Sequence, residues 1–276
     1  MRYNCIVPIC LGILCLALIT PTAAEFLVEG DNVICFKVQA QNNDGDSAEL
    51  CYYFTPGRVS GHYKKSLPGE QDLTADKGHK GKHLGKLKSL DLDFETDPRV
   101  SLGFSVEAAD VDTAFTITSA LVPFSAITNP LAYASAGVTL TGDGDGAQLT
   151  GLFAGGKAYE ARYNTDSTPV VWAQLVGPVT APPNTTVVSP DRRPGAGYEL
   201  IPATVSSIQS EFKFLLSAND LASGTSRFEV LVPEPGCFAL AAVGAVCLAG
   251  LACRRLFAAQ ALRRNRAPAD GREQQS

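Results

Sequence analysis

Apolar and polar residues alternate over many short stretches of this chain. In residues 101–108, Leu102, Phe104 and Val106 would share one face of a strand, while serine and glutamate occupy the other face. Short strands that are separated by Gly, Asp, Asn and Pro predict an all-β fold, specifically an antiparallel β-sandwich over residues 25–231. The same period-two pattern recurs in 111–122, 136–142, 147–154, 157–164, 168–176, 210–218 and 226–232, and a shorter strand is expected at 90–94.

The first two strands are predicted to form a hairpin. NVICFKVQA and SAELCYYFT flank the turn-forming QNNDGD at residues 41–46. If the strands pair so that residue numbers sum to 86, Cys35 faces Cys51 and Lys37 faces Glu49, with apolar residues on the other face. This register predicts a disulfide between Cys35 and Cys51. Two reduced cysteines, or a covalent partner elsewhere, are the alternatives.

Two regions, 56–99 and 177–197, interrupt the alternation and are expected to be long loops. The first contains His62, His79 and His83, but the glycines between them oppose the helix that a His-x-x-x-His zinc site requires. We therefore expect no metal and no cofactor. The same region is rich in lysine, which indicates either a solvated loop balanced by nearby acids or a contact with an anionic polysaccharide: Lys64, Lys65, Lys77, Lys80, Lys82, Lys86 and Lys88.

Other candidate motifs are weak. The stretch TGDGDGAQLTG at 141–151 does not fit an EF-hand, because the loop would begin at Thr141 and end at Leu152, so a hairpin turn is expected. Trp172, the only tryptophan, is expected in the core, although an exposed tryptophan could stack on a sugar. No nucleophile elbow or phosphate loop is present, and no particular pair of carboxylates is marked for catalysis.

Residues 1–24 have the pattern of a secretory signal peptide. Arg2 supplies the positive start, an apolar run extends from Cys5 to Ile19, and small residues precede a cleavage site between Ala24 and Glu25. A permanent anchor is the alternative, but a run of about 15 residues is short for a span, which needs about 20. Only Cys35 and Cys51 then remain in the predicted ectodomain, and export into an oxidising compartment favours their pairing.

A second apolar segment lies near the end of the chain. Gly236–Cys253 is 18 residues long and carries no charge. As a helix it would be about 27 Å long, roughly the thickness of the hydrocarbon core. Pro233 and Pro235 would fix its start and the pair Arg254 and Arg255 its end. The sequence predicts a single transmembrane helix over 236–253 and a basic cytoplasmic tail over 258–276.

The charge is divided between these parts. Residues 25–233 contain 16 Lys and Arg against 25 Asp and Glu, a net charge of −9. Residues 236–276 contain 6 against 2, a net charge of +4. An acidic body excludes general nucleic-acid binding, and the arginines after the helix place the body on the far side of the membrane.

The segment Val232-Pro233-Glu234-Pro235, followed by an apolar helix and Arg254-Arg255, resembles the PEP-CTERM sorting signal of Gram-negative bacteria, also labelled the ice-binding protein C-terminal motif. The resemblance covers about residues 231–257. It implies an exported precursor that the tail helix holds transiently in the inner membrane until an exosortase-type protease cuts near Pro-Glu-Pro. The chain departs from the family in the roughly 21 residues after Arg255, where members usually end within a few.

The residues and the resemblance together give three functional hypotheses. The first is a non-enzymatic protein of the cell surface or extracellular matrix, matured by signal peptidase and an exosortase-type protease. Sorting would depend on Pro233, Glu234 and Pro235, with Arg254 and Arg255 as the stop-transfer signal. The alternatives are a carbohydrate-binding module of an extracellular polysaccharide matrix and a secreted hydrolase. An ordinary single-span anchor is the alternative for the tail.

Overall fold

The computed structural model describes residues 33–54, 62–67, 69–95, 98–164 and 168–231. The chain divides into two compact units, residues 1–231 and 232–276, and every described residue lies in the first unit. Within the described ranges, no helix combines the length and the apolar character that a membrane crossing requires. The predicted signal peptide, sorting motif and tail helix lie outside these ranges.

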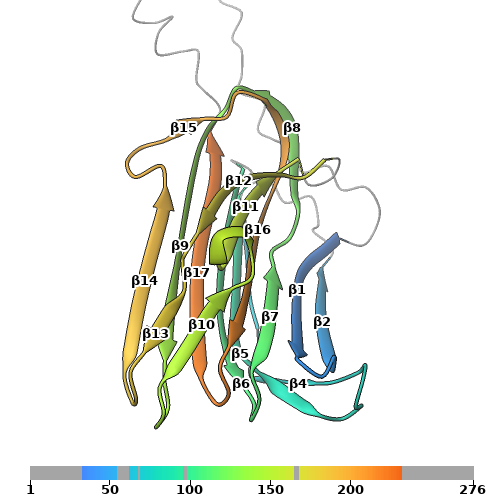
Figure 1. Cartoon of the computed structure of the whole chain (residues 1–276). Coiled ribbons are helices and arrows are strands. Elements are labelled where there is room, and N and C mark those ends of the chain that lie inside the picture. Colours follow the sequence, from blue (N-terminus) through green and yellow to red (C-terminus); the bar gives the residue numbers. More distant parts are fainter. Residues whose placement is uncertain (1–32, 55–61, 68, 96–97, 165–167, 232–276) are drawn as a thin grey trace, which may run out of the picture. The chain divides into compact units, whose positions relative to one another are not determined.

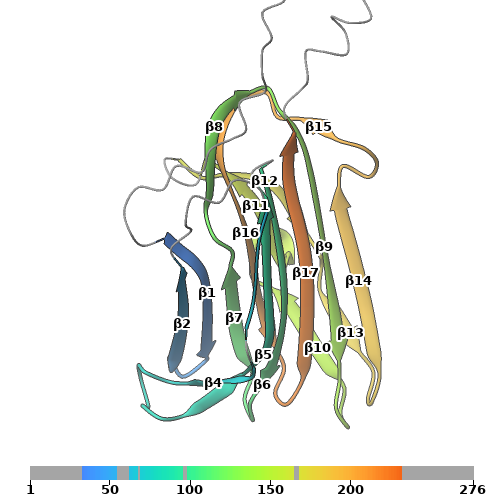
Figure 2. The same ribbon diagram turned by 180° about the vertical axis from the view of Figure 1, so that it is seen from behind.

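The described chain is all-β and forms two antiparallel sheets that face each other as a β-sandwich (Figures 1 and 2). The first sheet has the order β12 (Val170–Leu175), β11 (Tyr159–Tyr163), β16 (Thr204–Leu216), β7 (Thr113–Thr118), β1 (Val33–Asn42) and β2 (Ser47–Phe54). Three further strands join it through β16 and β10: β8 (Val122–Thr128), β10 (Ala147–Gly151) and β13 (Val179–Ala181).

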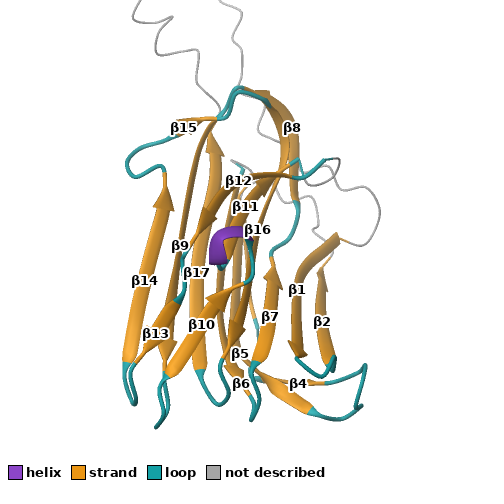
Figure 3. Ribbon diagram, in the orientation of Figure 1, coloured by secondary structure: helices purple, strands orange, loops and turns teal. Residues whose placement is uncertain are grey.

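The second sheet has the order β14 (Thr186–Arg193), β9 (Leu131–Thr141), β17 (Leu221–Leu231), β6 (Arg99–Ala108), β5 (His83–Glu95) and β3 (His62–Ser66). β15 (Glu199–Leu200) pairs with β9, and β4 (Gln71–Thr74) pairs with β5. The helical content of the described residues is one 3-10 turn, η1 (Ala154–Gly156), drawn in purple in Figure 3.

Aromatic side chains fill the space between the sheets. Phe104 of β6 meets Phe212 and Phe214 of β16, with ring centroids 4.9 and 5.9 Å away. Trp172 of β12 stacks on Phe228 of β17, with centroids 5.6 Å apart. Because each of these rings comes from an inward position of an alternating strand, the period-two pattern of the sequence is also the packing pattern of the core.

Each alternating stretch predicted from residue 101 onward contains a strand, so the β-sandwich prediction is confirmed for the described residues. The hairpin prediction is correct in its strands and wrong in its register. From Phe36 to Gln41, β1 pairs with β2 so that residue numbers sum to 88, and Lys37 therefore faces Cys51 and Gln39 faces Glu49.

The turn explains the shift of two residues. Asn42 and Asp46 close it, since the Asn42 Nδ2 donates to Asp46 Oδ2 at 2.9 Å and the Asp46 N–H donates to Asn42 Oδ1 at 2.9 Å. Gly45 takes a left-handed φ of 85° between them. A shift of two preserves the faces of both strands, but it removes the direct pairing on which the predicted disulfide depended. A bulge between Ile34 and Phe36 leaves Cys35 without a facing residue on β2.

The two regions expected to be loops contain strands, so that prediction is wrong, although the shorter strand expected at 90–94 is confirmed as part of β5. Residues 56–99 include β3, β4 and the 13-residue β5, which buries Leu84, Leu87, Leu90, Leu92 and Phe94. A bulge between Leu87 and Ser89 interrupts the alternation, and the lysines on the outward face hid the pattern. Residues 177–197 include β13 and β14. Strand β14 lies at a sheet edge, where Pro190 is tolerated.

The turn at 142–146 is also not the hairpin that was expected. It leaves β9 of the second sheet and enters β10 of the first sheet, so the flanking strands do not pair with each other. Gly146, at a φ of 95°, passes close to β13, since a Cβ there would lie 2.9 Å from the Ala181 carbonyl oxygen. The glycines of this stretch therefore allow the chain to cross from the second sheet to the first.

Candidate functional site

Most of the sequence-predicted site residues lie outside the described ranges: Ala24, Glu25, Pro233, Glu234, Pro235, Arg254 and Arg255. Cys35 lies in β1, but its side chain is outside the description. The Cys51 Sγ donates to Glu49 Oε1 at 3.2 Å, and Glu49 also pairs with Lys37 at 2.9 Å. The predicted disulfide is not shown by these contacts, and it stays a prediction.

The structure does not bring the histidines together. The His79 ring Nδ1 lies 2.9 Å from Asp46 Oδ1, and His83 Nε2 lies 3.5 Å from Asp72 Oδ1. The described residues contain no group of three or more His, Cys, Asp or Glu that could hold a metal ion. Hydrogen bonds from the His79 backbone N–H, from Asn42 and from the His79 side chain hold the pKa of Asp46 well below its usual range. These contacts fix the 75–82 turn against the β1–β2 hairpin.

Two lysines of the basic segment are paired with acids of the body. Lys82 lies 3.2 Å from Asp44, and this hydrogen bond raises the pKa of Lys82. Lys88 lies 2.8 Å from Glu107 and 3.2 Å from Glu70, and these carboxylates raise the pKa of Lys88. The contacts favour the interpretation in which nearby acids balance the segment.

Trp172 lies in the core and cannot be a sugar-stacking platform. Its side chain is 6% exposed and stacks on Phe228 at an interplanar angle of 18°. The Arg193 guanidinium lies over the same ring, 5.0 Å from the centroid. Arg193 also contacts Glu199 through Nε at 3.0 Å and Nη2 at 2.6 Å. Phe228 and Arg193 therefore both pack against the buried indole.

A groove of about 600 Å³ lies on the second sheet, over β9, β14 and β17. We call it the tyrosine–arginine groove. Its outward-facing residues alternate along the strands with buried ones such as Ala134 and Phe228. The complete lining is Tyr133, Ser135, Ala136, Gly137, Pro190, Asp191, Arg192, Thr225, Ser226 and Arg227.

Strand register places these residues in transverse rows. Gly137 of β9 faces Pro190 of β14 and Thr225 of β17, which makes one row of small or short side chains. In the adjacent row, Ser135 lies between Arg192 and Arg227. Gly137, Ser135 and Thr225, which have small side chains or none, therefore form the floor of the groove. The guanidinium groups of Arg192 and Arg227 border it.

Beside the groove, in contact with its lining residue Arg227, lies Glu229, which is buried although it faces away from the core. The Tyr198 hydroxyl donates to Glu229 Oε1 at 2.5 Å, and Arg227 Nε donates to Glu229 Oε2 at 2.7 Å. The hydrogen bond to Glu229 and partial burial raise the pKa of Tyr198. Tyr198 also contacts Tyr133, with ring centroids 6.0 Å apart. Glu229 therefore orients both Arg227 and Tyr198.

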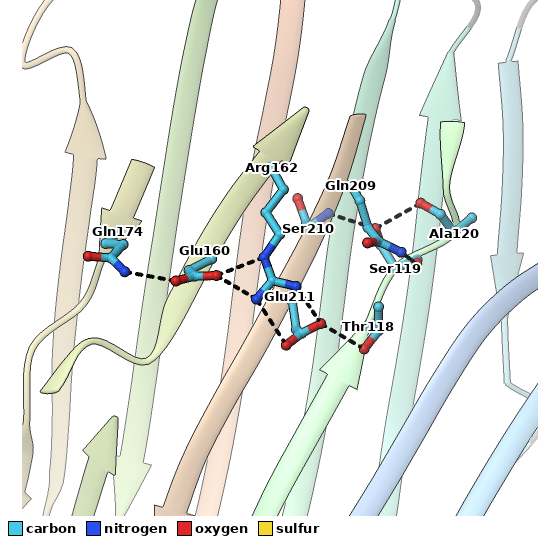
Figure 4. Close-up of polar contacts among 9 residues, drawn as sticks. All are labelled: Thr118, Ser119, Ala120, Glu160, Arg162, Gln174, Gln209, Ser210 and Glu211. Atoms are coloured by element: carbon cyan, nitrogen blue, oxygen red, sulfur yellow. Dashed lines mark hydrogen bonds and ion pairs between the residues drawn. The ribbon is translucent and has the colours of Figure 1, made fainter. Parts of the chain in front are cut away.

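The first sheet has a polar row on its own outward face (Figure 4). Glu160 of β11 faces Glu211 of β16 directly, a pairing that repels unless a cation lies nearby. Arg162 supplies it: Nε donates to Glu160 Oε2 at 2.7 Å and Nη1 donates to Glu211 Oε2 at 3.2 Å. Gln174 and Thr118 extend the row, donating to Glu160 at 2.7 Å and to Glu211 at 3.3 Å.

A buried serine pair lies beside this row, at the point where the chain leaves β7. The Ser119 N–H donates to the Ser210 carbonyl oxygen at 2.8 Å, and the Ser210 N–H donates to Ser119 Oγ at 2.9 Å. Ser210 Oγ lies 2.9 Å from the hydroxyl of Tyr159, whose burial raises its pKa to about 12. These bonds satisfy polar groups within the sandwich and are structural.

Sequence reasoning did not identify the tyrosine–arginine groove. Its signal was present in LAYASAG at 131–137, where tyrosine, serine and glycine occupy alternate positions, and in the same face of β17. Small residues that face solvent look unremarkable in one strand. Only the pairing of three distant strands makes them a groove.

Neither a family model nor a curated protein matches this chain. Among solved structures, the infectious bursal disease virus Gx strain is similar at 12% identity and a TM-score of 0.30, covering 77% of this chain and 59% of that chain. The VP2 subviral particle of the same virus is similar at 10% identity and a TM-score of 0.15, covering 77% of this chain and 67% of that chain. Likenesses this weak bear on neither fold nor function.

Proposed function

We propose that this chain is an exported, non-enzymatic β-sandwich protein, held in a membrane by its tail and then delivered to the cell surface or extracellular matrix. The observation that carries the proposal is the point in the sequence at which the last strand of the sandwich ends. β17 ends at Leu231, and Val232-Pro233-Glu234-Pro235 follows directly in the sequence. A protease acting near Pro-Glu-Pro would therefore cut just outside the last strand.

The carboxylates of the first sheet support a non-enzymatic role. Glu160 and Glu211 are close enough to share one arginine, but Arg162 occupies the space between them. A pair of catalytic carboxylates in a glycosidase must flank a bond of the substrate. Here the position between the carboxylates is filled by a side chain that neutralises them.

Mass spectrometry of the mature protein tests the route of delivery. We expect released protein to begin at Glu25 and to lack residues 236–276. We also expect Glu234→Gln to leave at least about tenfold more protein in the membrane fraction, as for loss of a charge-assisted recognition contact. Glu273→Gln, a matched change in the tail beyond the arginines, is the control and should be released normally.

The proposal fails if released protein carries an intact C-terminus. It also fails in its assignment of Glu234 if Glu234→Gln and Glu273→Gln are released equally. Retention of both variants would point to a general defect of the tail and would equally remove the specific role of Glu234.

Delivery through an oxidising compartment also favours a disulfide between Cys35 and Cys51. Cys51 faces Lys37 and the bulge leaves Cys35 without a facing residue, so the bond requires a local rearrangement at this end of the hairpin. We expect both thiols of the exported protein to resist alkylation until it is reduced, as read by peptide mapping. Two reactive thiols would instead support the register in which Lys37 faces Cys51.

A further inference from the structure

We propose that the tyrosine–arginine groove binds a segment of an acidic polysaccharide, through a uronic acid carboxylate and an adjacent sugar ring. The site is on the described sandwich. It depends on the proposed function only for its setting, because extracellular delivery is what would bring the groove to such a polymer. The groove's binding capacity can be measured whatever happens to the tail.

The low part of the groove suits a flat, extended ligand. Gly137 presents no side chain, and a Cβ placed there would lie 3.8 Å from its nearest neighbours, in ordinary van der Waals contact. Ser135 and Thr225, in adjacent strands, add hydroxyl groups that can donate or accept hydrogen bonds. Gly103 faces Thr225 from β6 and continues the low surface. The volume of about 600 Å³ lies within the usual range for sites of small ligands.

The charges of the groove select an anion. Arg192 and Arg227 face Ser135 from either side, on a body whose overall charge is negative. Glu229 neutralises and orients Arg227, and Lys157 lies 3.6 Å from Asp191, the carboxylate of the lining, so Arg192 leaves an excess positive charge at the rim. A guanidinium group binds a planar carboxylate through paired hydrogen bonds, which a compact ammonium group cannot do. A carboxylate placed over Ser135 would lie between the strand positions of Arg192 and Arg227.

The aromatic end of the groove selects a sugar. Tyr133 lines this end, and Tyr198, just outside the lining, is 44% exposed although it is held by Glu229 and by contact with Tyr133. A fixed, exposed aromatic ring offers an apolar surface on which the C–H face of a pyranose can stack. The guanidinium pair and the tyrosine pair are adjacent along β9, where Tyr133 and Ser135 are two residues apart. Neighbouring sugar and carboxylate groups occur together in a polyuronate.

Binding to polygalacturonate tests the site on the purified full chain in detergent micelles. We expect saturable binding by calorimetry, and about tenfold weaker binding for Arg192→Gln, as for loss of one charge-assisted pair. Gly137→Leu should block the groove without lowering the melting temperature, because its Cβ has room. Lys80→Gln, an exposed cation outside the groove, is the matched control and should bind as the unaltered chain does.

Two further polymers test whether the groove recognises the carboxylate, the sugar ring or both. Neutral dextran should bind at least tenfold more weakly if the arginines select a carboxylate, and linear polyphosphate should do so if the tyrosines select a sugar. Equal affinity for either polymer would overturn the proposal, as would unchanged affinity of the Arg192→Gln and Gly137→Leu variants. Because the tail is intact in every sample, such a failure would leave the proposed route of delivery standing.

Discussion

Gly224→Ala in β17 is expected to lower the free energy of unfolding by about 2–3 kcal/mol. Gly224 faces the core opposite Phe104, and a Cβ at Gly224 would lie 2.4 Å from two atoms of the Phe104 ring. The ring cannot easily move away, because Phe212 and Phe214 contact it from the other sheet. Urea unfolding followed by the fluorescence of Trp172, the only tryptophan, measures the change.

The expected destabilisation by Gly224→Ala is the opposite of the usual effect of replacing a glycine in a strand. In an open strand position, replacing glycine with alanine stabilises, since glycine costs about 0.5–1 kcal/mol in a strand interior. Gly103→Ala is the matched control: Gly103 lies in β6 on the outward face, where a Cβ would meet Asp91 at 3.6 Å. We expect Gly103→Ala to be neutral or slightly stabilising.

The Gly224→Ala change in a Phe104→Leu chain tests whether the Phe104 ring is the cause of the loss. Leucine at position 104 lacks the two ring atoms that would clash, so Gly224→Ala should cost less than about 1 kcal/mol in a Phe104→Leu chain. If Gly224→Ala costs the same in both backgrounds, the ring is not the cause of the loss. The packing explanation for this glycine would then be wrong.

The same region shows why the fold was predictable from sequence. Leu102, Phe104 and Val106 alternate with polar residues, and the structure buries all three. The inward face of a strand is encoded within the strand, because period-two alternation follows from backbone geometry alone. The sandwich therefore follows from local patterns that each extend over about a dozen residues or fewer.

Features that depend on a single local detail were predicted less well. The hairpin register depended on Asn42 and Asp46, whose side chains and backbone close the turn, and composition alone did not show which pair would do so. Only residues 90–94 of β5 were expected as a strand, and its first half was missed because the bulge between Leu87 and Ser89 breaks the period. A bulge inserts one residue and moves every later side chain to the other face of the pattern.

The candidate site could not be predicted because its parts come from distant segments. Pro190, Ser135 and Arg227 become neighbours only through the pairing of β14, β9 and β17. The order of strands in a sheet is set by long-range packing, which a single sequence does not reveal. The sorting motif is the opposite case, since its chemistry lies in one continuous segment and can be read directly.

Arg162→Met is expected to destabilise the sandwich by about 2–4 kcal/mol, because it leaves two largely buried carboxylates facing each other across β11 and β16. The side chains of Glu160 and Glu211 are 7% and 14% exposed, so water screens their repulsion poorly. Lys213→Met, which removes a cation from the same strand as Glu211, is the matched control and should change stability by less than about 0.5 kcal/mol.

If repulsion causes the loss, removing one of the charges must restore stability even though it adds a second substitution. The Arg162→Met, Glu211→Gln double variant should therefore unfold at a higher urea concentration than Arg162→Met alone, with Glu160 still accepting its hydrogen bond from Gln174. A double variant no more stable than Arg162→Met would show that Arg162 acts through packing, for example against Phe153, whose ring centroid lies 5.4 Å from the guanidinium carbon. The polar row would then be a consequence of how the first sheet pairs and not a source of its stability.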